Sequence, residues 1–126
     1  MREILFRGKC VDDGEWIYGY LLESYSMKWI INPLSDGNFK WFLVDENTIC
    51  QYTGLTDKNG NKIWENDVFR VITKDNYTGK VIFENGIFRV KWLTDDLLRT
   101  DLFFWTNKRA IEVISNVFDN KELLEE

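Results

Sequence analysis

The clearest pattern along the chain is a strict alternation of apolar and basic residues over 88–92. Alternation with a period of two residues is typical of a β-strand that is buried on one face only. The pair that precedes it, Asn85 and Gly86, is the preferred sequence for the two-residue turn of a β-hairpin. The pattern therefore predicts a hairpin that joins residues 80–84 to residues 87–92.

Further short segments rich in aromatic and β-branched residues follow one another along the chain, separated by Gly, Asn or Asp. We predict the other strands at residues 3–7, 15–22, 28–32, 39–44, 48–53, 62–64, 68–73 and 110–118. Many short strands with almost no amphipathic helix favour an all-β fold, either an antiparallel β-barrel or a barrel-like sandwich.

The breaks between the strands carry their own expectations. Pro33 should end the strand before it, and residues 76–79 contain the Asn and Gly of a predicted turn. Residues 94–106 are predicted to form a loop or a single helical turn. Residues 121–124 are predicted to form a short C-terminal helix that Asp119 or Asn120 could cap.

Length and charge narrow the class of protein. A chain of 126 residues and 15.1 kDa predicts one domain over residues 1–126. A net charge of −5 with 44% hydrophobic residues excludes charge-driven disorder and a strongly basic nucleic-acid binder. No apolar run reaches the roughly 20 residues of a membrane span, and charges interrupt the start of the chain. We therefore expect a cytoplasmic protein without a membrane partner.

The residue types available for catalysis and metal binding are few. The chain has no His, and its two Cys residues, Cys10 and Cys50, lack metal-site spacing. A cytosolic chain keeps such thiols reduced, so we expect both to be small buried apolar residues. Phosphate-binding loops and Ser/His/Asp sets are also missing from the sequence. We therefore expect no cofactor, no metal and no catalytic residue.

Two carboxylates, Glu65 and Asp67, leave two interpretations open. Their spacing would place both on one side of an extended segment, as an acid–base pair in a hydrolase requires. Alternatively, they accept backbone N–H bonds and hold a corner before the next strand, which is the interpretation we favour. The acidic segment beginning at Asp57 does not fit a calcium loop, because Gly60 is at its fourth position rather than its sixth.

A basic and aromatic ladder, Arg89, Lys91 and Trp92, is the tentative binding surface of the sequence. Small β-barrels bind single strands by stacking bases on aromatic side chains next to Lys and Arg. The negative net charge opposes this, so a solvated strand face is favoured and a nucleic-acid partner is not expected. Six Trp residues exceed the needs of a small core, and some are expected at a subunit interface.

Residues 51–68 read QYTGLTDKNGNKIWENDV. This block resembles the YopX family of phage and prophage proteins, whose signature is Q-Y-T-G-L, D-x-x-G and an aromatic residue before E-G-D-[IV]. Asn66 replaces the usual Gly of that signature, and Asn tolerates the left-handed conformation such a turn needs. Both ends of the chain also resemble the family. The residues of this structural turn motif are Tyr52, Gly54, Leu55, Asp57, Gly60, Glu65 and Asp67.

The resemblance implies a mainly β fold with a central barrel and assembly into homo-oligomers, rings included. It implies no established catalytic activity, so no catalytic residue is transferred. We therefore expect a non-catalytic phage or prophage accessory protein in the host cytosol, an oligomeric scaffold or a binding module for a host or phage protein. The alternatives are a nucleic-acid-binding barrel in phage replication or regulation, and a hydrolase using Glu65 and Asp67.

Overall fold

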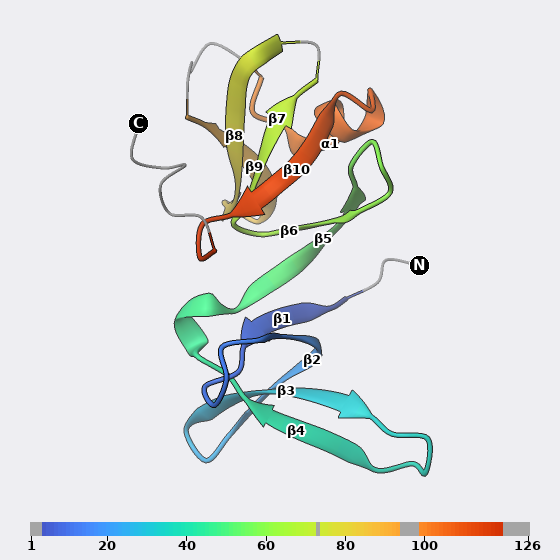
Figure 1. The fold of residues 1–126 in the computed structure, drawn as a ribbon, viewed down its shortest axis with the longest axis vertical. Coiled ribbons are helices and arrows are strands. Elements are labelled where there is room, and N and C mark those ends of the chain that lie inside the picture. The colour runs from blue at the N-terminus through green and yellow to red at the C-terminus, as the bar shows by residue number, and fades with distance from the viewer. Residues whose placement is uncertain (1–3, 73, 94–98, 120–126) are drawn as a thin grey trace. The chain divides into compact units, whose positions relative to one another are not determined.

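The computed structural model describes residues 4–72, 74–93 and 99–119 and divides into two compact units, Met1–Tyr52 and Thr53–Glu126, termed here the N-terminal and C-terminal units (Figure 1). The elements are, in chain order, β1 (Phe6–Lys9), β2 (Trp16–Ser24), β3 (Met27–Pro33), β4 (Phe39–Leu43), the 3-10 helix η1 (Glu46–Thr48), β5 (Cys50–Thr56), β6 (Lys62–Trp64), β7 (Asp67–Val71), β8 (Lys74–Glu84), β9 (Ile87–Trp92), α1 (Leu102–Asn107) and β10 (Ile111–Asn116). The fold is therefore all-β, as predicted.

The N-terminal unit is a curled antiparallel sheet in the order β4-β3-β2-β1, with the first residues of β5 beside β1. An isolated bridge joins Cys10, just after β1, to Val44, just after β4. Both residues are buried, together with Ile30 and Cys50, and the described cysteines are free thiols. The two cysteines are thus the small buried residues that the sequence predicts.

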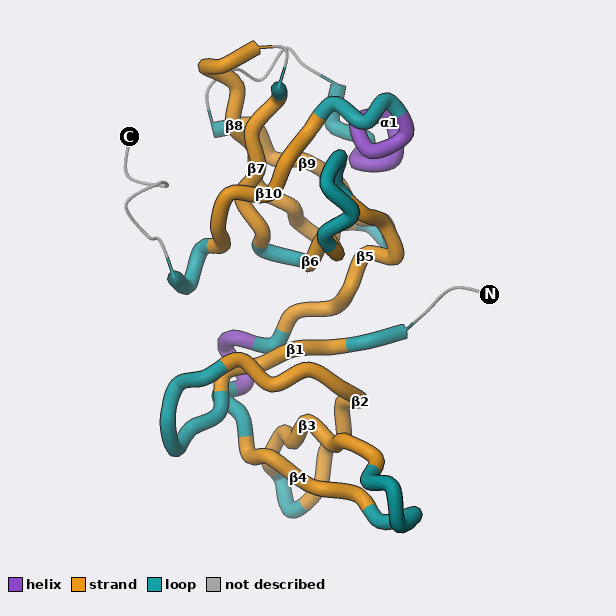
Figure 2. Tube along the Cα trace, turned by 45° about the vertical axis from the view of Figure 1, so that its right-hand side comes forward, coloured by secondary structure: helices purple, strands orange, loops and turns teal. Residues whose placement is uncertain are grey.

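The C-terminal unit has a four-stranded antiparallel sheet in the order β10-β7-β8-β9, and the end of β5 pairs with β6. Asp101 caps α1 by accepting a hydrogen bond from the Phe103 N–H at 3.1 Å, and α1 lies near β9 (Figure 2). The helix contributes Leu102 to the core of this unit. The buried core residues are Ile63, Phe69, Val71, Val81, Val90, Trp92, Leu102 and Ile111.

The predicted hairpin is confirmed. Glu84 pairs with Ile87, and the two residues between them have the positive φ angles of a two-residue hairpin turn, 54° at Asn85 and 82° at Gly86. Asn66 also has a positive φ of 72°, as its replacement of Gly in the motif requires. In both turns the residue types matched the backbone conformation.

The predicted turn at residues 76–79 is wrong, because β8 is continuous from Lys74 to Glu84. Gly79 lies inside this strand and faces the core. A Cβ atom there would lie 2.7 Å from Val90 Cγ1 and 2.8 Å from Phe69 Cζ. Gly79 is therefore required by the packing of neighbouring strands and not by a turn.

Other boundaries differ from the predictions by a few residues. The first strand begins at Phe6 rather than at residue 3, since pairing with β2 starts there. Pro33 is the last residue of β3, and α1 is longer than the single turn expected. The predicted helix at 121–124 lies outside the described residues.

Among the described strands, neither sheet closes completely, so the barrel-like description fits better than a closed barrel. No helix in the described part of the chain has the length and apolar character needed to cross a membrane.

Candidate binding surfaces

The motif that resembles the family signature is built around the buried carboxylate of Asp57. Its Oδ1 accepts hydrogen bonds from the backbone N–H groups of Asn59 and Asn61, both at 2.9 Å. Its Oδ2 accepts the N–H of Val113 in β10 at 3.0 Å. Gly60, with φ of 83°, completes the turn in the left-handed conformation. The carboxylate of Asp57 therefore closes the turn and ties it to the last strand.

Burial and hydrogen bonding act on Asp57 in opposite directions. Burial raises the pKa of this carboxyl, while the N–H groups of Val113, Asn61 and Asn59 lower it, and the net pKa lies below the ordinary value. Asp57 consequently remains ionised at neutral pH as an acceptor of backbone hydrogen bonds. A carboxylate held in this way is unsuited to donate a proton to a substrate.

The other residues of the motif belong to β5 and to the corner that Glu65, Asn66 and Asp67 form. Gly54 has a positive φ of 85°, Tyr52 is buried, and Leu55 packs against the core cluster. At the second corner, Asp67 is 2% exposed and its Oδ2 accepts the Trp64 N–H at 2.8 Å, while Glu65 is half-buried. These contacts describe a structural corner in which Asp67 organises the backbone.

Glu112 in β10 is a charged group that sequence reasoning missed. Arg70 of β7, its cross-strand partner, makes an ion pair with it, and Lys58 Nζ lies 3.8 Å from Glu112 Oε2. The hydrogen bond from Arg70 is the main cause that lowers the pKa of Glu112. This cluster of Lys58, Arg70 and Glu112 links the turn closed by Asp57 to β7 and β10. Both basic residues are at least 42 positions away from Glu112 in the chain, so no local pattern indicates the cluster.

The predicted ladder of Arg89, Lys91 and Trp92 is divided between the two faces of its strand. Trp92 is 5% exposed, packs edge-on against Phe69 at 5.8 Å, and donates its indole N–H to the Arg99 carbonyl at 3.0 Å. Lys91 is exposed on the opposite face. The Trp92 ring therefore belongs to the core, and only the two basic residues belong to the surface.

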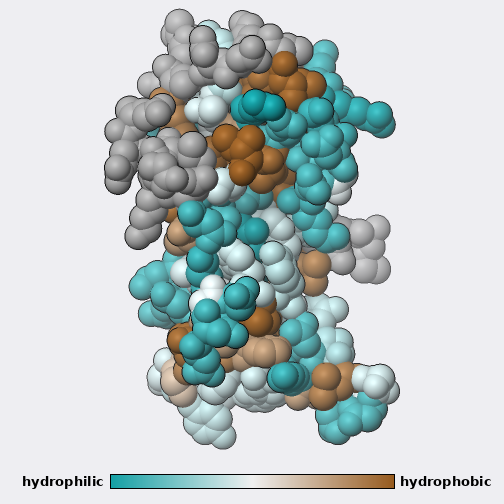
Figure 3. Space-filling model, viewed as in Figure 1, coloured by the Kyte–Doolittle hydropathy of each residue, from teal (hydrophilic) through white to brown (hydrophobic). Residues whose placement is uncertain are grey.

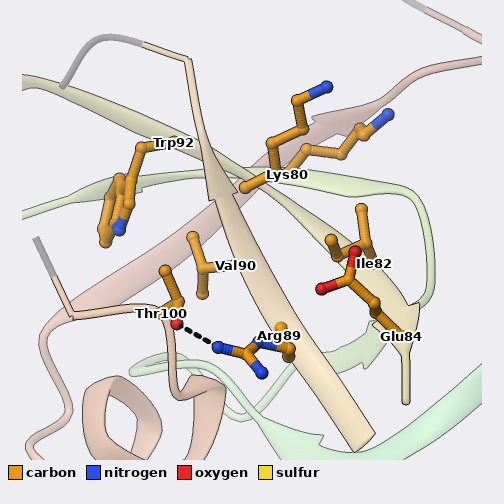
Figure 4. Close-up of a pocket in the computed structure, with 8 residues that line it drawn as sticks. Lys80, Ile82, Glu84, Arg89, Val90, Trp92 and Thr100 are labelled. Atoms are coloured by element: carbon orange, nitrogen blue, oxygen red, sulfur yellow. Dashed lines mark hydrogen bonds between the residues drawn. The ribbon is translucent and has the colours of Figure 1, made fainter. Parts of the chain in front are cut away.

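A groove of about 520 Å³ lies along the β8–β9 hairpin and includes these basic residues. Figure 4 shows Lys80, Ile82 and Glu84 on one strand and the hydrogen bond from Arg89 to Thr100, while the Trp92 ring lies on the other side of the β9 ribbon from Lys80. The structure thus adds Lys80 to the pair predicted from the sequence. We refer to this region as the β8–β9 groove. Its lining residues are Lys80, Ile82, Glu84, Arg89, Val90, Lys91, Trp92 and Thr100.

A second surface, on the N-terminal unit, consists of aromatic side chains on the outer face of β2, β3 and β4. Tyr20 pairs with Ile31, and Ile31 pairs with Trp41, so these three residues share one face of the sheet. Tyr18 and Phe39 extend the row. We refer to these residues as the aromatic face, and its exposed rings are Tyr18 (49%), Tyr20 (50%), Phe39 (53%) and Trp41 (46%).

The aromatic face is ordered by contacts at both sides. The Trp41 ring packs edge-on against Trp29 with centroids 5.6 Å apart. At the β1 side, the Arg7 guanidinium lies 4.3 Å from the centroid of the Trp16 ring and Lys9 Nζ lies 5.2 Å from it. In the space-filling view, side chains of intermediate and high hydropathy gather at the surface of this unit (Figure 3).

Fold and surfaces together define a small all-β protein with an aromatic sheet face and a separate basic groove. The model of the YopX protein family matches residues 5–125, a range that spans both units, and the chain belongs to that family. The crystal structure of protein EF1440 from Enterococcus faecalis is similar, with a TM-score of 0.63 and 21% sequence identity over 98% of this chain and 99% of that one. This similarity concerns the fold. None of the curated proteins matches the chain.

Proposed function

We propose that this YopX family protein is a non-catalytic binding module encoded by a phage or prophage, which acts in the host cytosol and self-associates through the aromatic face. The observation that carries this proposal is a set of four aromatic side chains, each about half exposed, on one face of β2 and β4, with Ile31 of β3 between Tyr20 and Trp41. Contiguous exposed apolar surface of this kind marks interaction sites in soluble proteins. Tyr, Trp and Phe are also the residues enriched in the buried centres of protein interfaces.

A second copy of this chain is the partner that the charges at the rim favour. Lys9, which is half-buried, lies at the β1 side of the aromatic face, whereas the exposed Asp36 lies in the turn that leads into β4. The N–H of Asn38 lowers the pKa of Asp36, so this carboxylate stays ionised. A two-fold axis parallel to the strands would place the basic side of one copy over the acidic side of the other.

The hydrolase alternative receives less support from the geometry of the second corner. Asp67 is buried and accepts a backbone N–H, and Glu65 precedes a residue in the left-handed conformation, Asn66. Such a carboxylate is occupied in holding the turn. The binding-module proposal relies on a surface that is exposed to a partner. It requires only structural roles for the Asp57 turn and for the corner at Glu65 and Asp67.

The experiment is size-exclusion chromatography with multi-angle light scattering on the wild type and on Tyr20→Thr and Trp41→Thr. Threonine keeps the β-propensity of an exposed strand position while removing the ring. If the aromatic face is the interface, the wild type elutes as a dimer or larger assembly. Each variant should raise the dissociation constant about tenfold or more, as expected for an interface hot spot.

Phe83→Thr is the matched control. Phe83 lies on a strand of the C-terminal unit, is 49% exposed and packs against a second ring, Phe88, at 4.8 Å, as Trp41 does against Trp29. This variant should associate like the wild type. A wild type that is monomeric at micromolar concentration, or an equal effect of all three variants, would remove the proposal.

A further inference from the structure

The β8–β9 groove contains an arrangement of charges that is unfavourable for the protein alone. Lys80 and Lys91 are directly opposite each other in the register of the hairpin. Like charges in such a cross-strand pair destabilise the sheet. Within the described chain, no ion pair joins either ammonium group to a carboxylate. Departures from local stability rules are expected at functional sites, and an anion between the two lysines would reverse the sign of this interaction.

Arg89 adds a third positive charge to the same groove. Its Nη2 donates a hydrogen bond to Thr100 Oγ1 at 3.0 Å, and this contact orients the guanidinium. A guanidinium carries five N–H donors in a planar fork that matches phosphate oxygens, so one bond leaves donors for a ligand. Glu84 lines the groove at the hairpin end and partly offsets this charge. Lys80, Lys91 and Arg89 outnumber this carboxylate, which leaves the groove with an excess of positive charge.

We propose that the β8–β9 groove binds the phosphate backbone of a single nucleic-acid strand. An acidic peptide is the main competing ligand, and peptides commonly bind by adding a strand to an exposed sheet edge. At β9 this edge is already occupied, because Val90 donates its N–H to the Thr100 carbonyl at 2.8 Å and Arg89 forms an isolated bridge with Asp101. A flexible phosphate chain needs no such edge, since it binds through side-chain cations and hydroxyl groups.

The position of Trp92 determines how the groove could bind a single nucleic-acid strand. Its ring is in the core, so it offers no platform on which a base could stack. Recognition then rests on phosphate contacts, which do not distinguish base sequence. Three cations predict a slope of about −2 for the logarithm of the binding constant against the logarithm of salt concentration, at roughly 0.7 per phosphate. The net charge of −5 keeps this binding weak and sensitive to salt.

The test measures fluorescence anisotropy of a labelled single-stranded oligothymidylate with the wild-type protein across a salt series. Lys91→Gln should weaken binding roughly threefold or more at low salt and reduce the salt slope from about −2 to about −1.4. Its melting temperature should stay the same or rise, because the substitution also removes the repulsion with Lys80. Loss of binding without loss of stability separates a ligand-binding lysine from a structural one.

Lys108→Gln makes the same change in net charge at an exposed position of α1's C-terminal end and should bind like the wild type. Polyglutamate of matched length serves as the peptide probe. The proposal is overturned if the wild type does not bind the oligonucleotide at low salt, if Lys91→Gln leaves the slope unchanged, or if polyglutamate binds as tightly. None of these readouts depends on the aromatic face, so the failure of either proposal can be distinguished from the failure of the other.

Discussion

The carboxylate of Asp57 accepts a hydrogen bond from the backbone N–H of Val113 at 3.0 Å, which joins two residues 56 positions apart in the chain. The same carboxylate closes its own turn through Asn59 and Asn61. One buried side chain thus fixes a local turn and attaches the last strand to it. This relationship explains why the central motif needs an aspartate at this position without assigning it a catalytic role.

Replacing Asp57 should therefore be costly. In Asp57→Ala, three half-buried hydrogen bonds from backbone N–H groups lose their acceptor, and we expect a loss of about 3 kcal/mol in the free energy of unfolding, measured in urea. Asp36→Ala is the matched control, because Asp36 forms a similar turn with the Asn38 N–H at 3.0 Å but is fully exposed. A much smaller effect is expected there, and similar losses in the two variants would contradict the assigned role of Asp57.

The depressed pKa of Asp57 predicts a specific acid dependence. Because its pKa is lower in the folded state than in the unfolded state, its contribution is complete above the unfolded value of about 3.9 and is lost as the pH falls through the folded value. Stability measured as a function of pH should fall steeply below about pH 4 in the wild type and less steeply in Asp57→Asn. Parallel curves for the two proteins would show that this carboxyl does not carry the effect.

Asp67 separates the structural and catalytic interpretations of the second corner. If the carboxylate of Asp67 holds the corner by accepting the hydrogen bond from the Trp64 N–H, Asp67→Ala should lower the free energy of unfolding by about 1–2 kcal/mol. If Glu65 and Asp67 were held together as an acid–base pair, their repulsion would be relieved and stability would stay the same or increase. Thermal melting of the variant gives the sign directly, and a higher melting temperature would favour the catalytic interpretation.

Gly79 tests the continuous path of β8. A methyl group added in Gly79→Ala would meet the Phe69 ring and the Val90 side chain, so we expect a loss of about 1–3 kcal/mol from overpacking. Gly79→Ala should cost less in a Val90→Ala background than in the wild type, because the smaller side chain leaves space for the methyl group, and a double-mutant cycle measures this difference. Absence of any loss in the single variant would indicate that the glycine is not at a packed strand position.

Features set by neighbouring residues could be predicted from the sequence. The Asn85-Gly86 hairpin is one, because two adjacent residue types determine its turn conformation. Gly79 shows the limit, since the residues that require it, Phe69 and Val90, lie on other strands. That Trp92 and Lys91 lie on opposite faces of β9 could also be predicted, because they are consecutive residues and successive side chains of a strand point to opposite faces.

The aromatic face could not be predicted in the same way. Each residue of this face fits the alternating pattern of its own strand. The row forms only because the register between strands places Tyr20, Ile31 and Trp41 side by side. The composition indicated a surplus of aromatic residues and an interface, without giving its location. Register between strands depends on contacts across the whole sheet, which a single sequence does not display.

The most direct test of the central proposal is oxidative footprinting of the wild-type protein at concentrations above and below its assembly transition. Tyr20 and Trp41 should be protected in the assembled protein and reactive after dilution, whereas Phe83, which has a similar exposed fraction, should react equally in both. Protection that follows assembly at these two residues is the result the proposal predicts. Unchanged reactivity of Tyr20 and Trp41, with assembly demonstrated by light scattering, would contradict it.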